Sequence, residues 1–145
     1  MLIQPSQADV RRFFCSVHAK ASQNQPLEPI EALAAGWILE HPEFHAQLQD
    51  VDAAIAQMHT DGSAQTNPFL HLSMHLSVSE QCSIDQPRGI RRAVEMLAQR
   101  RNSLHLAHHE VMESLGEMIW ESQRSSRPPD GDAYVARVLQ RASRD

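Results

Sequence analysis

The sequence predicts an all-α fold, a single bundle-like helical domain of about six or seven helices over residues 1–145. Apolar residues recur every three or four positions in successive segments, which is the spacing of one buried helix face. Breaks that contain proline separate these segments, and no stretch alternates apolar and polar residues as a strand does. Aromatic residues make up only 5% of the chain. The core must therefore come from aliphatic residues and methionine, a set dominated by helix formers.

The first part of the chain predicts two helices and a shorter one. Ser6 or Asp9 can cap the first helix, which ends near the Asn-Gln-Pro string at 24–26. The second begins near Leu27 and ends at His41, because a residue before proline is pushed out of the α region. Pro42 then opens a short helix. The apolar positions of these segments are Val10, Phe13, Phe14, Val17, Ile30, Leu33, Ala34, Trp37, Ile38, Phe44 and Leu48.

The middle of the chain predicts a helix from Val51 to Met58, then a polar loop and a more apolar helix. Asn67 can cap that helix and Pro68 occupies its favoured first position, so it runs from there to about Gln81. Its apolar residues lie on several sides of the helix rather than on one face. Such a helix is normally central in its domain.

The C-terminal part predicts three more helices. One follows the turn at 85–87, the longest runs from Leu104 to Ser125, and a last one starts at Asp130 to Asp132, after two prolines. The stripe expected to be buried on the longest helix consists of Leu104, His108, Val111, Leu115 and Met118 or Ile119. Trp37 and Trp120 stand at apolar helical spacing, so we expect both in the core.

The charge of the chain argues against nucleic acid as a partner. The formal net charge is −5, whereas proteins that follow phosphate backbones are usually basic. Residues 88–145 contain ten arginines against eight acidic residues, a small excess that favours a solvated helical surface. Association with nucleic acid through this arginine-rich half is the weaker alternative.

The cysteines and the N-terminus predict a cytoplasmic protein. Cys15 and Cys82 have no CxxC companion and are too few for a disulfide framework, so we expect two buried free thiols. The first residues contain no apolar run like that of a signal peptide. No stretch is long enough to span a membrane, so we expect no membrane partner.

Three histidine pairs with i, i+4 spacing are the most chemically informative feature: His41/His45, His71/His75 and His105/His109. Four residues turn a helix by about 400°, so both rings of such a pair stand on one face. One helix can thereby offer two imidazoles to one metal ion. The His41/His45 pair is the weakest, because Pro42 interrupts the helix between its members.

The predicted metal ligands are His71, His75, His105 and His109, with Glu113 as a fifth group one turn after His109. Imidazole suits zinc and iron, the two ions we expect, and a carboxylate adds negative charge. The alternative is that no cofactor binds and the histidines form hydrogen bonds to backbone groups or neighbouring carboxylates.

Three segments carry distinctive strings: NPFLHLSMHLSVSEQ at 67–81, DQPRGIRRA at 85–93 and HLAHHEVMESLGEMIWESQR at 105–124. They resemble a family of small bacterial proteins described only as a domain of unknown function. The resemblance implies a cytoplasmic bacterial protein and supplies no activity or ligand. In that family the third pair often reads HxxEH, whereas His108 stands here in place of the glutamate. If the metal ligands of the family include that glutamate, this chain must have a different ligand set.

Two classes of function follow from these observations. The first is a histidine-rich helical-bundle metalloprotein, with hydrolytic or redox activity left open. The second is a non-enzymatic interaction or accessory protein with structural histidines, whose partner is another protein or a small molecule. Neither the reaction nor the oligomeric state follows from the sequence.

Overall fold

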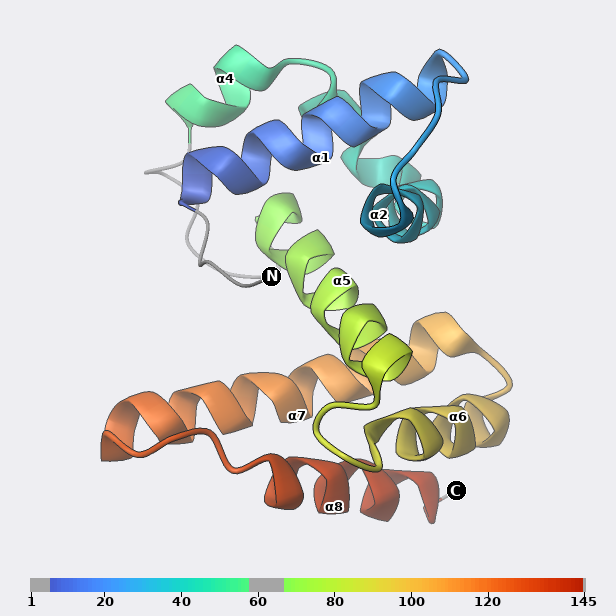
Figure 1. Cartoon of the computed structure of the whole chain (residues 1–145), viewed down its shortest axis with the longest axis vertical. Coiled ribbons are helices and arrows are strands. Elements are labelled where there is room, and N and C mark those ends of the chain that lie inside the picture. Colours follow the sequence, from blue (N-terminus) through green and yellow to red (C-terminus); the bar gives the residue numbers. More distant parts are fainter. Residues whose placement is uncertain (1–5, 58–66, 145) are drawn as a thin grey trace. The chain divides into compact units, whose positions relative to one another are not determined.

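The computed structural model describes residues 6–57 and 67–144, and helices account for most of them. The described residues contain no strand, which confirms the all-α prediction. Within the described residues, eight α-helices, close to the six or seven predicted, and one 3-10 turn follow in chain order (Figure 1): α1 Gln7–Ser22, α2 Pro29–Leu39, η1 Pro42–Phe44, α3 His45–Leu48, α4 Val51–Ala56, α5 Pro68–Ile84, α6 Ile90–Arg101, α7 Leu104–Ser125 and α8 Gly131–Ala142.

The helices form two compact units, Met1–Leu76 and Ser77–Asp145. The division falls inside α5, whose first part belongs to unit 1 and whose last part belongs to unit 2. The prediction of one domain over residues 1–145 stays a prediction, because a division by contacts does not say whether two units unfold together.

In unit 1, α1 packs against α2, α3 and α4. Its N-terminus is a capping box, in which the Ser6 hydroxyl accepts from the Asp9 backbone and the Asp9 carboxylate accepts from the Ser6 backbone. Both residues were predicted as possible caps, and both take part. The core of this unit is built from Phe14, Cys15, Val17, Ala34, Trp37, Ile38, Leu48, Ala54, Phe69, Leu72 and Leu76.

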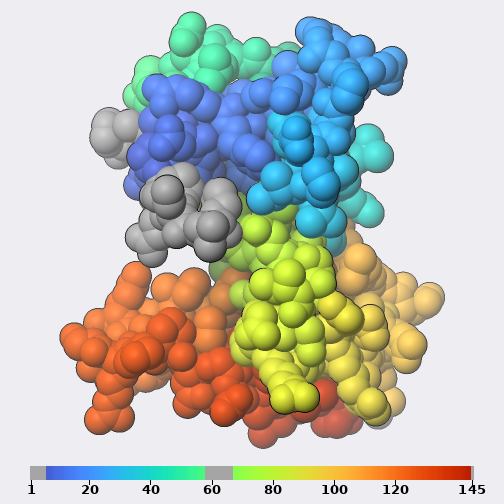
Figure 2. Space-filling view, viewed as in Figure 1, coloured from blue at the N-terminus to red at the C-terminus, as the bar shows by residue number. Residues whose placement is uncertain are grey.

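In unit 2, α6, α7 and α8 contact one another pairwise. All three contribute to the visible surface of the unit, in yellow, orange and red (Figure 2). The Tyr134 hydroxyl donates to Gln81 Oε1 at 2.6 Å and so joins α8 to the last part of α5. The largest fully buried side chains here are Val78, Ile90, Leu97, Val111, Tyr134 and Val138.

Local chemistry explains the boundaries of α7. Asn102 ends α6 in the left-handed region, at φ 53°, which asparagine tolerates better than most residues. The Ser103 hydroxyl then accepts from the Leu106 backbone and caps α7. The predicted range Leu104–Ser125 is confirmed.

The predicted stripe on α7 is correct in the middle of the helix and wrong at its ends. His108, Val111 and Leu115 are buried, but Leu104 is 54% exposed and Ile119 is 41% exposed. The separate prediction that Trp120 lies in the core is also wrong, because Trp120 is 57% exposed. The neighbouring helices α6 and α8 have 12 residues each, against 22 in α7. At about 1.5 Å per residue, each can cover only part of one α7 face.

The cysteines agree in part with the prediction. Both are free thiols, Cys15 buried and Cys82 only partly so. Trp37 is 7% exposed and belongs to the core, as predicted. Within the described ranges, no helix combines the length and the apolar character needed to cross a membrane.

Candidate metal centre

The end of α2 positions the first ligand candidate. His41 precedes Pro42 and adopts φ −128° and ψ 63°, outside the helical region, as expected for a residue before proline. Its backbone N–H donates to Ile38 O at 3.0 Å. A regular helix would instead direct that N–H to Trp37 O, four residues back.

Two histidine side chains bind the carbonyls at this helix end. His41 Nδ1 donates to Trp37 O at 2.7 Å, and His45 Nε2 donates to Ile38 O at 2.8 Å. Because a carbonyl can only accept, Nδ1 of His41 carries the proton. In the neutral ring, Nε2 of His41 therefore presents a lone pair.

Three imidazoles of unit 1 converge through their Nε2 atoms. His41 Nε2 lies 3.1 Å from His71 Nε2. His71 Nε2 lies 3.2 Å from His75 Nε2. A ligand nitrogen of His75 also lies within 4.8 Å of one of His41. The name three-histidine cluster is used below for His41, His71 and His75.

These separations match those of ligands around a tetrahedral ion. Zinc binds imidazole nitrogen at about 2.0–2.1 Å, which places two tetrahedral ligands about 3.3–3.4 Å apart. The 3.1 and 3.2 Å contacts are within a few tenths of an ångström of that value.

The two contacts of His71 Nε2 limit where the protons of the cluster can lie. Nε2 of His41 is an acceptor, so the proton of that contact must come from His71. A neutral imidazole nitrogen carries at most one proton. The two contacts of His71 Nε2 would therefore have to share that proton if His75 also presents a lone pair. An ion in its place would meet all three lone pairs.

Aromatic rings surround the three-histidine cluster. Trp37 stacks on His75 with ring centroids 4.1 Å apart and planes 19° apart. Phe44 stacks on His41 at 5.2 Å and meets His71 edge-on at 5.7 Å. His41 is 2% exposed and His75 is fully buried. The rings are thus held in fixed orientations in apolar surroundings, as the ligands of metal sites are.

Unit 2 holds the third histidine pair. His105 and His109 lie edge to face with centroids 4.6 Å apart, and a ligand nitrogen of each lies within 4.8 Å of the other. His108 is 2% exposed. Burial, with smaller contributions from the charges of His105 and His109, lowers the pKa of His108 to about 3. His108 is thus an uncharged core residue.

In unit 1, His41 and His75 offer ring nitrogens of the kind that a metal ion binds, as His71 does, and in unit 2 His105 and His109 do the same. Among the described residues, no carboxylate or thiol joins a candidate ligand group. The Glu113 carboxylate pairs with Arg141 at 3.0 Å and its side chain is 65% exposed. The predicted ligand set that joins His71/His75 to the other pair, with Glu113, stays a prediction.

The contact of His41 with the pair on α5 was not predicted from the sequence. The interruption of the helix between His41 and His45 was predicted, and these two side chains do diverge. His45 bonds to Ile38 O and lies 4.9 Å from the His18 ring. The interruption, however, is what frees His41 to approach the pair on α5. The signal was the proline after a histidine at a helix end, where a ring N–H can bind a free carbonyl.

Comparison with known proteins identifies the family. The chain matches the domain of unknown function DUF1841 over residues 6–140. It belongs to that family, as the strings at 67–81, 85–93 and 105–124 suggested. No curated protein and no solved structure matches it.

Proposed function

We propose that this protein binds a divalent transition-metal ion, with zinc favoured, through His41, His71 and His75. The observation that carries the proposal is the convergence of three Nε2 atoms at 3.1 and 3.2 Å. The bond from His41 Nδ1 to Trp37 O supports it, because a ligating histidine usually donates its other N–H to a carbonyl or carboxylate.

The donor set favours zinc over iron. Imidazole nitrogens suit both ions, but open non-haem iron sites typically combine two histidines with one carboxylate. The candidate ligand groups of the described residues contain histidine alone. Three neutral imidazoles would leave the double positive charge of the ion uncompensated. A zinc ion in that state lowers the pKa of a bound water to about 7.

The test is zinc titration of protein purified without a histidine tag, by calorimetry and by elemental analysis. We expect saturable binding by the wild type. His71→Ala and His41→Ala should weaken it by more than about tenfold, which corresponds to ~1.4 kcal/mol. The matched control is His45→Ala, which removes an imidazole four residues from His41 that lies outside the cluster. Equal and weak binding by wild type and His71→Ala would refute the proposal.

A spectroscopic readout is available in Trp37, which stacks on His75. The variant Trp120→Phe removes the other tryptophan, so that the remaining fluorescence reports on the cluster alone. Copper or nickel should quench Trp37 emission at the stoichiometry of binding. Quenching that survives His71→Ala unchanged would place the bound ion elsewhere.

The double variant His105→Ala/His109→Ala tests the second pair. Unchanged zinc affinity and stoichiometry assign the ion to the three-histidine cluster of unit 1. A loss of affinity as large as that of His71→Ala supports the ligand set predicted from the sequence. If the wild type binds two zinc ions and the double variant binds one, the second pair binds an ion of its own.

One observation favours the alternative, a non-enzymatic protein with structural histidines. Both His41 and His45 bind carbonyls at the end of α2, a role that needs no metal. Under that alternative, the folded wild type contains no metal, and added zinc leaves its melting temperature unchanged. A zinc-dependent rise in melting temperature that His71→Ala abolishes favours the metal.

A further inference from the structure

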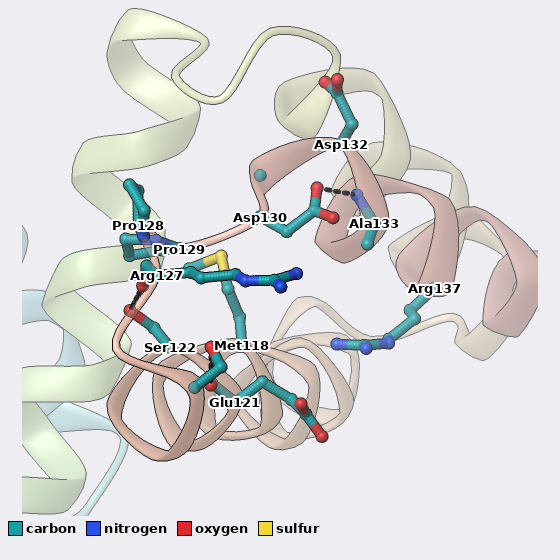
Figure 3. Close-up of a pocket in the computed structure, with 12 residues that line it drawn as sticks. Met118, Glu121, Ser122, Arg127, Pro128, Pro129, Asp130, Asp132, Ala133 and Arg137 are labelled. Carbon is teal, nitrogen blue, oxygen red and sulfur yellow. Dashed lines mark hydrogen bonds between the residues drawn. The ribbon is translucent and has the colours of Figure 1, made fainter.

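A second candidate site lies wholly in unit 2, where the end of α7 faces the start of α8. A pocket of ≈ 670 Å³ opens there. The name α7–α8 pocket is used below for it. Figure 3 shows side chains from both helices and from the connecting segment directed into it. Its lining includes Met118, Glu121, Arg127, Pro128, Pro129 and Arg137.

The connecting segment is held in place by its backbone. Ser126 ends α7 in the left-handed region, at φ 57°. The Ser122 hydroxyl then donates to Arg127 O at 2.5 Å. Two prolines follow, and each fixes its own φ. Gly131 is required at the start of α8, because a Cβ there would lie 2.9 Å from Pro87 Cβ. The wall that carries Arg127 is therefore firmly positioned.

The carboxylates around the α7–α8 pocket are engaged or turned away. Asp130 Oδ1 accepts from the Ala133 backbone at 3.0 Å and caps α8. Glu121 binds Arg124 at 3.0 Å. Asp132 points away from the hollow in Figure 3. Asp130 and Glu121 thus each have a partner of their own, although all three carboxylates belong to the lining of the pocket.

Two guanidinium groups are directed into that centre. The Arg127 side chain extends across the hollow toward Arg137 (Figure 3). Among the described residues, the Arg127 guanidinium makes no ion pair. Arg137 lies 3.7 Å from the Glu117 carboxylate, and the Arg137 side chain is 36% exposed. Both cations are therefore available to a ligand.

We propose that the α7–α8 pocket binds a small organic phosphate, with the phosphate between Arg127 and Arg137. Guanidinium groups pair with phosphate through two parallel hydrogen bonds, a geometry that lysine lacks. The organic part lies against Met118, Pro128 and Pro129, which form the apolar wall. This site is independent of the proposed metal, because none of the histidines contributes to it.

The test is calorimetric titration with phenyl phosphate, with inorganic phosphate and benzyl alcohol as probes for the two halves of the ligand. We expect phenyl phosphate to bind most tightly. Arg127→Gln and Arg137→Gln should each weaken it by about tenfold or more, as expected for the loss of a charged hydrogen bond. Arg127→Lys should restore only part of the affinity. All of these residues are on the surface, so circular dichroism should show an unchanged fold.

Two further variants make the test specific. Arg92→Gln removes an exposed arginine of α6 outside the pocket and should leave binding unchanged. Glu121→Gln removes a negative charge from the lining and should tighten binding by up to about fivefold. If Arg92→Gln and Arg127→Gln lose the same affinity for phenyl phosphate, binding depends on the total charge and not on the pocket. That result would overturn the proposal. So would inorganic phosphate binding as tightly as phenyl phosphate, or no binding of either at millimolar concentration.

Discussion

Two histidine pairs of this protein have the same spacing and different surroundings. His71 and His75 belong to unit 1, where His41 joins them and Trp37 stacks on His75. His105 and His109 belong to unit 2, where they meet edge to face. Beside them stands His108, which burial holds uncharged.

The difference shows that i, i+4 spacing alone places two imidazole rings on one face of a helix and does not set their surroundings. A third imidazole must come from another segment of the chain, and in unit 1 it comes from a helix end interrupted by Pro42. In unit 2 the nearby polar side chains have another role. Glu110 binds Arg101 at 2.6 Å and Arg141 at 3.6 Å. In unit 1 a third imidazole thus lies beside the histidine pair, whereas in unit 2 the residue after His109 forms ion pairs with two arginines.

The largest effect is expected from Leu115→Asp, which tests whether the two units unfold together. Leu115 is 4% exposed on α7. A buried unpaired carboxylate should cost more than about 4 kcal/mol, enough to unfold a typical domain. Zinc binding should be lost as well, because the helix that carries His71 and His75 continues into unit 2. Urea denaturation and zinc titration measure the two effects.

The matched control for that substitution is Leu104→Asp, on the same helix at a position 54% exposed. It should change the free energy of unfolding by no more than about 0.5 kcal/mol. If Leu115→Asp unfolds unit 2 yet zinc binding persists, the units are separate domains and the single-domain prediction is wrong.

Each unit contains one cysteine, and the pKa of both thiols is raised. Burial raises the pKa of Cys15 in unit 1, and it raises that of Cys82 in unit 2 from 9.0 to about 11. Because the thiolate is the nucleophile, two pKa units imply alkylation of Cys82 about 100-fold slower at pH 8 than for an ordinary thiol. Iodoacetamide labelling of the Cys15→Ser variant, followed by mass spectrometry, measures this rate.

Labelling of the Cys15→Ser variant unfolded in urea gives the reference rate, because Cys82 is then exposed to solvent. The folded rate should rise with pH until about pH 11, since the thiolate forms only there. A folded rate close to the reference at pH 8 would contradict the raised pKa of Cys82.

The smallest effect concerns the ion pairs. Arg101 contacts both carboxylate oxygens of Glu110, at 2.6 and 3.1 Å, with both side chains less than a quarter exposed. A double-mutant cycle with Arg101→Met and Glu110→Gln should give a coupling of about 1 kcal/mol. The single contact between Lys20 and Glu31 in unit 1 is the comparison. A coupling at Lys20–Glu31 as large as at Arg101–Glu110 would remove the contrast between the units.

Most of the secondary structure could be predicted because its signals are local. A capping serine, a proline in a first helical turn or an asparagine before a break acts on residues within one turn of itself. The range of α7 was therefore predictable from its own neighbourhood. Exposure of its ends was not, because it depends on the lengths of α6 and α8.

The sequence by itself determined the helices, their ends and the facing pair of His71 and His75, because backbone geometry and capping act over a few residues. Only the tertiary structure decided that His41 meets that pair, that Trp37 lies against it and that Trp120 is exposed. The physical reason is that these outcomes depend on packing between segments far apart in the chain. His41 and His71 are 30 residues apart, and no local pattern sets the 3.1 Å between their nitrogens.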